Sequence, residues 1–332
     1  MKAITYDQFG KADVLRLADV PRPEPRPSDL LVSVKALGVN RADLLQREGY
    51  YGTQNYGESP LLGLELAGEV VEVGSDVEDI VPGDRVMAIV GGGAYAEYAR
   101  VDRSMAVKIP ADLSYVEAAA VMESFVTAWE ALVHLGQIKF GAVVLIHAAA
   151  GGIGSAAVQI GHALGARVLA TASAARRSEV QALGADRVFD YIAEDFEAGA
   201  KDATNGHGVD VIVDFVGGDY FVRNLRSLKP GGRLVQVGLL SGEENVQVPL
   251  SLVLHNHLRI IGTVMKSRNA EEKRAMVRRF AEYGLPLFAE GRLRPIVGQI
   301  FPLPGAAEAH KYMETGGGFG KIVLTVDDDL EL

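Results

Sequence analysis

The chain has 332 residues, with 33 basic and 43 acidic side chains, so its formal net charge at pH 7 is −10. This charge disfavours binding to nucleic acid or to anionic membranes, and no apolar run approaches the roughly 18 residues that a membrane-spanning helix needs. The absence of cysteine excludes disulfides, thiolate zinc sites, iron–sulfur clusters and cysteine nucleophiles. We expect a cytoplasmic protein, because polar residues follow Met1 too soon for a signal peptide.

The first third of the chain is β-rich, and Pro and Gly residues separate its strand-like runs. These runs are residues 1–6, 30–37, 65–73 and 85–89. They predict a mostly antiparallel, barrel-like domain. A last strand-like run, residues 320–326, has no obvious partner elsewhere, and we assign it to this first domain.

Two helix starts are marked by capping boxes, in which a small polar residue is followed three positions later by Glu. Ser114 and Glu117 form the first and precede a helical pattern that continues to Leu135. Asn269 and Glu272 form the second. Acidic residues are interleaved with the basic residues of the helix that follows. This pattern is typical of a solvated helix face rather than of a nucleic-acid contact.

An apolar run, residues 143–148, ends in a turn of small residues that opens onto the helical pattern of residues 155–164. This is the form of a dinucleotide-binding strand, turn and helix, because pyrophosphate oxygens must approach backbone N–H groups that larger side chains would block. Ala149, Gly151 and Gly154 occupy the three glycine positions of the GxGxxG pattern. The candidate cofactor-binding residues of the turn are Ala150, Gly151, Gly152, Ile153 and Gly154.

Five further β-rich runs follow, each separated from the next by a helix-length or connecting segment. They are residues 167–172, 187–190, 209–215, 233–238 and 259–264. The alternation predicts an α/β fold with a doubly wound, parallel, six-stranded sheet.

The whole chain resembles the medium-chain dehydrogenase/reductase superfamily. The motifs that carry the resemblance occur in the family's order and spacing: GVNRAD at 38–43, GLELAG at 63–68, PGDRV at 82–86 and the turn at 149–154. The resemblance implies a GroES-like barrel domain, residues 1–122 and 267–332, and an NADPH-binding Rossmann domain, residues 123–266.

Within this superfamily the chain resembles the zinc-independent quinone oxidoreductases. Zinc alcohol dehydrogenases have Cys where this chain has Asn40 and His where it has Leu64, so we expect no metal. Three further segments, 123–128, 216–220 and 309–314, are similar to the stress-inducible quinone oxidoreductases and their bacterial relatives. The segment 49–58 departs from the proline-rich loop of many relatives, which leaves the substrate preference open.

The second strand of the nucleotide domain ends at Ser173 without the carboxylate that binds the 2′-hydroxyl of NAD. Arg176 and Arg177 follow within one helical turn and could bind a 2′-phosphate, which favours NADPH. The alternative is that these arginines only solvate a helix start. Tyr191 matches a residue that flanks the phosphate in a relative.

The resemblance implies that Asn40, Tyr51 and Thr127 line the nicotinamide cleft, although each could equally satisfy a turn or pack locally. Gly217, Gly238 and Leu239 lie at strand ends, where open α/β sheets receive their ligands. Glu65 is as consistent with a structural ion pair as with acid catalysis. A buried, hydrogen-bonded role is the expectation for His147.

These features predict transfer of reducing equivalents from NADPH to a small-molecule quinone or related acceptor, with one-electron and two-electron reduction both open. The alternatives are reduction of an activated C=C bond in an alkenal or enone, and a non-enzymatic, crystallin-like NADPH-binding protein. We also expect a homodimer, because the strand-like run 259–264 would lie at a sheet edge that relatives pair across a dimer axis.

Overall fold

The computed structural model describes residues 1–50, 59–316 and 318–326. The chain packs into two compact units. The first contains residues 1–123, 266–289 and 294–332, and the second contains residues 124–265 and 290–293. No helix in the described part of the chain is long and apolar enough to cross a membrane.

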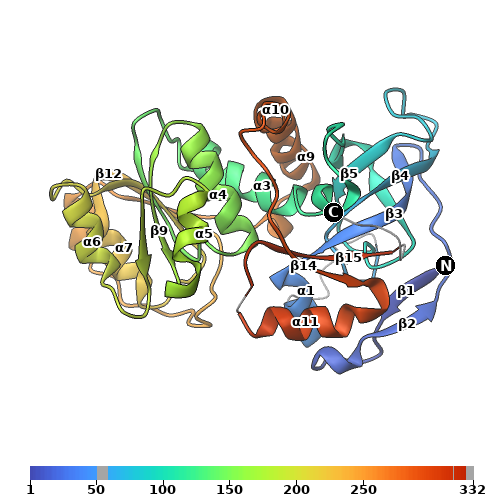
Figure 1. Ribbon diagram of the computed structural model, residues 1–332, viewed down its shortest axis with the longest axis horizontal. Helices are drawn as coiled ribbons and strands as arrows, with labels where there is room; N and C mark the ends of the chain where they lie inside the picture. The colour runs from blue at the N-terminus through green and yellow to red at the C-terminus, as the bar shows by residue number, and fades with distance from the viewer. Residues whose placement is uncertain (51–58, 317, 327–332) are drawn as a thin grey trace. The chain divides into compact units, whose positions relative to one another are not determined.

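The first unit is built on a mostly antiparallel sheet, as predicted (Figure 1). Its strand order is β14-β15-β3-β4-β5-β7, with β6 also paired to β3, and β1 and β2 form a separate ribbon. The strands are β1 (Lys2–Thr5), β2 (Arg16–Asp19), β3 (Asp29–Val39), β4 (Glu65–Val73), β5 (Arg85–Ile89), β6 (Tyr98–Asp102), β7 (Ala106–Lys108), β14 (Val297–Pro302) and β15 (Lys321–Thr325).

The C-terminal strand β15 pairs antiparallel with the long strand β3. This confirms that the last strand-like run returns to the first domain. Apolar side chains that alternate along β3, β4 and β15 form one buried cluster, which includes Leu37, Leu66 and Leu324. The pairing brings residues 321–325 beside residues 36–39, which are far away in the sequence, and the candidate site depends on it.

Both predicted capping boxes are present, at Ser114 with Glu117 and at Asn269 with Glu272. The helices that lie wholly in the first unit are α1 (Arg41–Glu48), α2 (Tyr115–Ala118), α9 (Ala270–Arg279), α10 (Pro286–Ala289) and α11 (Ala306–Glu314).

The helical pattern predicted from Ser114 to Leu135 is not one continuous helix. It is divided into α2, α3 (Met122–Trp129) and a π-helical turn, Glu130–Leu135. The break between α2 and α3 lies where the backbone approaches β3 closely, since a Cβ atom on Gly38 would lie 2.7 Å from the carbonyl oxygen of Ala119. The approach forces Gly at position 38 of β3.

The second unit contains the predicted six-stranded sheet, with order β10-β9-β8-β11-β12-β13 and parallel pairing throughout. This is the order of a doubly wound dinucleotide fold. The strands are β8 (Val143–Ile146), β9 (Arg167–Ala172), β10 (Arg187–Asp190), β11 (Val209–Asp214), β12 (Leu228–Gln236) and β13 (Arg259–Gly262).

Helices cover this sheet: α4 contacts β8 and β9, α5 contacts β9 and β10, and α7 contacts β12 (Figure 1). The helices of the unit besides α3 are α4 (Gly152–Ala163), α5 (Arg177–Ala182), α6 (Phe196–Ala203), α7 (Tyr220–Ser227) and α8 (Leu250–His255). The central strand β8 is apolar throughout and almost fully buried, as is typical of a central strand in a parallel sheet. Strand β13 lies at the edge, as predicted.

Candidate functional site

The turn between β8 and α4 has the geometry of a nucleotide-binding turn. Gly151 is the N-cap of α4 and carries no side-chain cap, so side-chain oxygens do not occupy the first-turn amides. A Cβ atom on Gly154 would lie 2.3 Å from the carbonyl oxygen of Ala148, so only glycine lets the helix pack this closely on the strand. The exposed amides and the helix dipole together favour an anion at this position.

His147 immediately precedes this turn, and its side chain is fully buried. Its ring lies 3.1 Å from the Thr171 hydroxyl through Nδ1 and 2.7 Å from the Asn224 amide oxygen through Nε2. Asn224 in turn donates to Asp214. Burial lowers the pKa of His147, against the opposing charge of Asp214. The expectation of a hydrogen-bonded core histidine is confirmed.

Gly217, Gly238 and Leu239 follow the carboxyl ends of β11 and β12, as expected. A Cβ atom on Gly217, whose φ is +70°, would lie 2.6 Å from Leu239 Cδ2, so these two positions face each other. The Gly217 N–H donates to the Asp214 carboxylate, however, at 3.2 Å. Its amide is therefore already used within the unit.

The segment after β9 holds the residues predicted to select the cofactor. Ser173 is the N-cap of a short 3₁₀ helix that ends at Arg176. Arg176 donates to Glu179 at 2.9 Å, and Arg177 forms an ion pair with Glu194. Both guanidinium groups are partly exposed and carry carboxylate partners in this structure.

Tyr191, which directly follows β10, is 49% exposed. It lies three residues before Glu194, whose carboxylate also accepts the backbone N–H of Asp190 at 2.5 Å. Glu194 therefore ties the end of β10 to the segment that follows β9. Sequence reasoning missed Glu194 because 17 positions separate it from Arg177.

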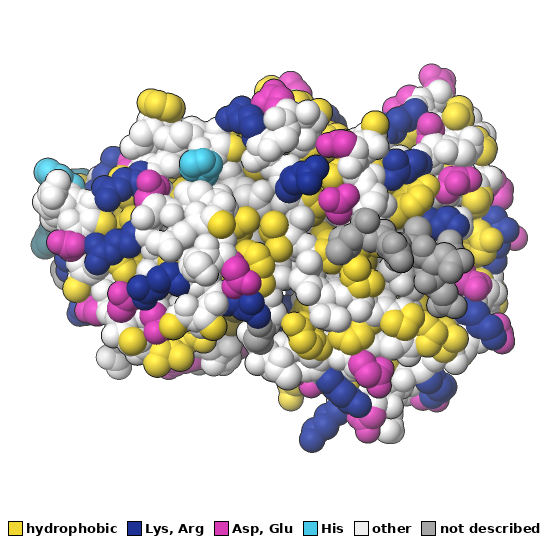
Figure 2. All heavy atoms as spheres, viewed as in Figure 1, with side chains coloured by type: hydrophobic (Ala, Val, Ile, Leu, Met, Phe, Trp, Pro, Cys, Tyr) yellow, Lys and Arg dark blue, Asp and Glu magenta, His cyan; other side chains and the backbone are white. Residues whose placement is uncertain are grey.

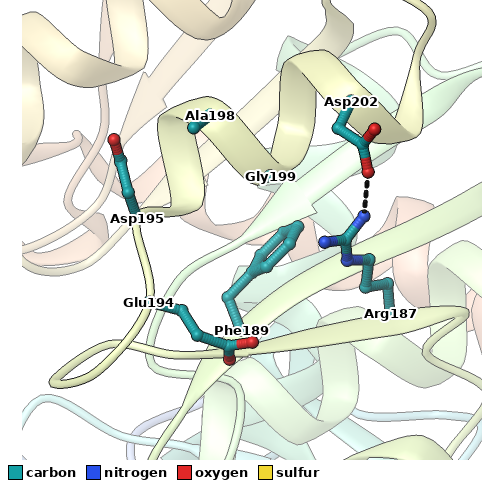
Figure 3. A pocket seen from close by; sticks show the side chains of 7 residues that line it. All are labelled: Arg187, Phe189, Glu194, Asp195, Ala198, Gly199 and Asp202. Atoms are coloured by element: carbon teal, nitrogen blue, oxygen red, sulfur yellow. Dashed lines mark hydrogen bonds and ion pairs between the residues drawn. The ribbon is translucent and has the colours of Figure 1, made fainter.

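An open hollow lies beside these residues, between β10 and α6 (Figure 3). Its floor is the Phe189 ring, which packs under Gly199 so tightly that a Cβ atom there would lie 2.3 Å from the ring. The Arg187 side chain points to Asp202 and donates to it at 2.8 Å. None of the predicted cofactor residues lines this hollow.

In the first unit, Asn40 is the N-cap of α1 and its side chain is turned into a buried polar cluster. Its amide nitrogen donates to Glu65 at 3.0 Å, and its amide oxygen accepts from Lys321 at 2.7 Å. Lys321 also forms an ion pair with Glu65 at 2.5 Å and donates to the carbonyl oxygen of Val39 at 3.1 Å. The three N–H groups of the ammonium are thus all accounted for.

In this cluster Glu65 forms a buried ion pair, the structural alternative that the sequence allowed. Its side chain is 1% exposed and that of Lys321 is 6% exposed. Sequence reasoning missed Lys321, although a lysine at the start of an apolar strand was a usable signal. The pairing of β15 with β3 decides its partner.

A second chain of hydrogen bonds links two buried residues of α1, Arg47 and Asp43, through His310 and Tyr95. Arg47 Nη1 lies 3.4 Å from His310 Nδ1, and His310 Nε2 lies 3.0 Å from the Tyr95 hydroxyl. Tyr95 donates to Asp43 at 3.2 Å, and the same carboxylate oxygen accepts the Asn40 N–H at 2.8 Å. Because burial and the nearby Arg47 charge lower the pKa of His310 to about 3, the imidazole is neutral.

Two carboxyl groups of the cluster hold protons more tightly than usual. Burial raises the pKa of Asp43 to about 7. Burial and the charge of Glu65 raise the pKa of Glu123 to about 8, against the opposing charge of Lys321. One oxygen of each, Asp43 Oδ1 and Glu123 Oε2, is buried without a hydrogen-bond partner among the described residues.

Of the other predicted site residues, Thr127 lies half-buried on α3 in the second unit. Tyr51 lies outside the described residues, as does most of the segment 49–58 that departs from the family pattern. The structure therefore places Asn40 and Thr127 each within its own unit.

The residues present do not fit a zinc site. At the two positions where zinc alcohol dehydrogenases have ligands, Leu64 offers no donor and the Asn40 oxygen is bound to the Lys321 ammonium. That ammonium already compensates the charge of Glu65. Within the described ranges, no group of three or more His, Cys, Asp or Glu side chains is arranged to hold a metal.

Comparison with known families agrees with both units. Residues 26–111 match the family described as an alcohol dehydrogenase GroES-like domain, and residues 152–282 match the family described as zinc-binding dehydrogenase. The chain is 32% identical to human quinone oxidoreductase over 336 residues, which cover 98% of this chain and 97% of that protein. It is also 32% identical to a phenolphthiocerol/phthiocerol polyketide synthase of Mycobacterium tuberculosis, over 97% of this chain but only 15% of that protein's length.

Three solved structures share the fold over 98% of this chain. A quinone oxidoreductase from Pseudomonas syringae has a TM-score of 0.88 and 31% identity, with 99% of that chain covered. The CurK enoyl reductase has a TM-score of 0.88 and 27% identity, with 98% covered. A mycobacterial protein complexed with NADPH has a TM-score of 0.87 and 31% identity, with 99% covered.

The two units and their nucleotide turn are therefore those of an oxidoreductase of the medium-chain dehydrogenase/reductase superfamily. The chain belongs to the zinc-independent quinone oxidoreductase branch of that superfamily. This confirms the family that the sequence motifs indicated.

We expect Lys321→Met to lower the free energy of unfolding by about 3 to 5 kcal/mol, because it leaves the Glu65 charge buried and uncompensated. The double variant Lys321→Met/Glu65→Gln should recover most of this loss, since it removes both charges. Urea denaturation of the wild type, both single variants and the double variant measures the coupling. A loss below about 1 kcal/mol in Lys321→Met would contradict the assignment.

Stability should also fall as the pH rises through neutrality. The folded-state pKa of Asp43 is about 7 against an ordinary value of 3.8, so between these values the folded protein holds a proton that the unfolded chain releases. This contribution is fully present below about pH 4 and is lost as the pH rises to about 7. It amounts to at most about 4 kcal/mol, at about 1.4 kcal/mol for each pKa unit.

The variant Asp43→Asn cannot titrate and should have a flatter stability profile. Urea midpoints at pH 5, 6, 7 and 8 for the two proteins test this. Parallel profiles would show that Asp43 titrates normally. The wild type should keep a residual slope near pH 8 in either case, from Glu123.

Proposed function

We propose that this protein is an NADPH-dependent reductase of quinones. The observation that carries the proposal is the Lys321 ammonium, which binds Glu65 and also Asn40, a residue at a position where zinc-dependent relatives have a metal ligand. Without a Lewis acid, the acceptor must stabilise the negative charge that a hydride brings. A quinone does so by itself, because the charge spreads over its conjugated oxygens.

The second unit would hold the cofactor mainly through its backbone. The uncapped amides of the first turn of α4, residues 152–154, would bind the pyrophosphate, whereas the Gly151 N–H already donates to the carbonyl oxygen of Ala148 at 3.1 Å. Arg177, with Arg176 and Tyr191 beside it, would bind the 2′-phosphate. The adenosine and nicotinamide parts of the cofactor would contact residues that follow the carboxyl ends of the strands, namely Ser173, Gly238 and Leu239. When bound, NADPH supplies the hydride.

The carboxylate partners of the arginines do not exclude a phosphate. The ion pair of Arg177 with Glu194 is between partly exposed side chains, 41% and 39% exposed, and such pairs are worth at most about 1 kcal/mol. A charge-assisted hydrogen bond to a phosphate contributes about 1.5 to 3 kcal/mol. The guanidinium can therefore exchange one partner for the other.

The first unit would position the acceptor. Asn40 is held at both ends of its amide and at its backbone N–H, so it offers a fixed wall rather than a mobile side chain. Tyr51 and Thr127 would line the nicotinamide side, as the family resemblance implies. Such fixed positions favour reaction by holding the reactants in one orientation.

A second candidate function is the reduction of an activated C=C bond in an alkenal or enone. It is favoured by the likeness to the CurK enoyl reductase and to a polyketide synthase. The same hydride geometry serves both reactions. Initial rates with a naphthoquinone and with an α,β-unsaturated aldehyde, in the presence of chelator, separate them.

We expect Arg177→Ala to reduce the preference for NADPH over NADH by about 10- to 100-fold, since one charge-assisted hydrogen bond to the 2′-phosphate is lost. Dissociation constants of both cofactors from nucleotide fluorescence, and steady-state rates with a naphthoquinone, measure the effect. Arg187→Ala, equally exposed and in the same unit, is the matched control. An unchanged preference in Arg177→Ala would refute the assignment, and NADPH binding without turnover on any acceptor would favour a non-enzymatic role.

We also propose a homodimer, formed through the edge strand β13. This strand has no neighbour on one side within the described part of the chain, and its Ile260 side chain is 42% exposed. An uncovered edge with apolar side chains favours pairing with a second copy. Light scattering at micromolar concentration should give about twice the 35.4 kDa chain mass, and Ile260→Lys should shift the mass toward one chain. A monomeric wild type would contradict the proposal.

A further inference from the structure

Buried polar side chains join three neighbouring strand ends of the second unit. Thr171 lies near the end of β9, His147 directly follows β8, and Asp214 is the last residue of β11. These strands are adjacent in the sheet, in the order β9-β8-β11, and all three side chains are buried. An open α/β sheet receives its ligand at the carboxyl ends of its strands, where the strand order reverses, and here the order reverses between β8 and β11. The three side chains therefore lie at the strand ends that would receive a nucleotide.

At one end of this network, Asp214 holds the loop that follows β11. Its carboxylate accepts the backbone N–H groups of Val216 at 2.7 Å and Gly217 at 3.2 Å, and the side-chain amide of Asn224 at 3.0 Å. Because the Asn224 nitrogen donates to Asp214, the Asn224 oxygen is the acceptor that faces His147 Nε2 at 2.7 Å. The proton of the neutral imidazole is therefore on Nε2, and Nδ1 is an acceptor.

At the other end, Thr171 holds the turn between β8 and α4. Its hydroxyl donates to His147 Nδ1 at 3.1 Å and accepts the backbone N–H of Ala148 at 3.3 Å. Its carbonyl oxygen accepts the N–H of Ala149 at 2.9 Å. All the side-chain bonds of the network thus run in one direction, from the Ala148 N–H to the Asp214 carboxylate. No member can reverse its bond without leaving a buried neighbour unpaired.

Ala148 is the residue of this turn whose backbone most needs support. Its φ is +48°, in the left-handed region that residues with a Cβ atom rarely adopt. Its carbonyl oxygen accepts the Gly151 N–H at 3.1 Å, and a Cβ atom on Gly154 would lie 2.3 Å from the same oxygen. The conformation of Ala148 therefore determines how the first turn of α4 is placed against β8.

We propose that His147 is a positioning residue, which couples the turn between β8 and α4 to the loop after β11 and fixes both before a dinucleotide binds. A binding segment that is ordered in advance binds more tightly, because its ordering no longer opposes association. The buried imidazole acts on the nucleotide only through these two segments. This inference rests on the nucleotide binding in the proposed function, but it does not depend on the cofactor preference or on the acceptor.

The first test is Thr171→Val, which keeps the shape of the side chain and removes the hydroxyl that joins His147 to Ala148. The dissociation constant of NADPH should rise about five- to tenfold, as expected for the loss of about one hydrogen bond that orders the turn. That of NADH should rise by the same factor, since both cofactors carry the pyrophosphate. The KM for NADPH should rise while kcat at saturating NADPH stays nearly unchanged. Thr171→Ser keeps the hydroxyl and should restore the affinity.

Thr204→Val is the matched control for a purely structural role. Thr204 is also buried in the second unit, and its hydroxyl also accepts a backbone N–H, that of Gly208 at 2.9 Å, and donates to a buried partner, the Ala200 carbonyl oxygen at 2.8 Å. Urea denaturation should show comparable losses of stability in Thr171→Val and Thr204→Val, whereas nucleotide fluorescence should show weaker binding only in Thr171→Val. Equal weakening in both variants would overturn the inference.

Asn224→Leu tests whether the coupling passes through His147, because Asn224 bonds to the opposite side of the imidazole from Thr171. If the network acts as one unit, NADPH binding to the double variant Thr171→Val/Asn224→Leu should be little weaker than to either single variant. Effects that multiply in the double variant would mean that the two residues act independently, and would overturn the inference.

The outcomes for the inference and for the proposed function are separable. If Thr171→Val binds NADPH and NADH as the wild type does, the inference alone is overturned. If the wild type binds both cofactors but reduces neither a quinone nor an enone, the proposed function fails, and the dissociation constants of the variants still decide the inference. A wild type that binds neither cofactor would overturn both.

Discussion

The buried ion pair between Lys321 and Glu65 is the contact on which the first unit's candidate site depends. A charge buried this completely is tolerated only when it is paired and hydrogen-bonded. Here the pair also binds both ends of the Asn40 amide, so one interaction fixes three side chains. It joins the last strand of the chain to β3 and β4, far away in sequence, and so couples the site to the closure of the sheet.

An ammonium group in this place has a chemical consequence. It supplies one positive charge and only hydrogen-bond donors, whereas a metal ion would offer open coordination positions. The Lys321 cluster therefore positions neighbouring groups but cannot polarise a substrate carbonyl by coordination. Under the proposed function, the acceptor itself must therefore stabilise the added charge.

The nucleotide turn of the second unit, residues 149–154, contains no charged side chain. Its turn relies on glycine, on an uncapped helix N-terminus and on the buried His147, Asn224 and Asp214 network beneath it. The arginines that follow β9 form partly exposed ion pairs, which can exchange one partner for another. The face in Figure 2 likewise shows acidic and basic side chains interspersed rather than separated into one patch.

The sequence by itself determined the family, the six-stranded parallel sheet, both capping boxes and the return of the last strand, because periodicity, caps and glycine turns are local signals. Only the tertiary structure decided which charges meet. Lys321 and Glu65 form an ion pair although they are far apart in the sequence, and Arg177 pairs with Glu194, which follows the neighbouring strand. Burial beside Glu65 raises the pKa of Glu123. Burial and long-range pairing set these properties, and the spacing of residues along the chain does not reveal either of them.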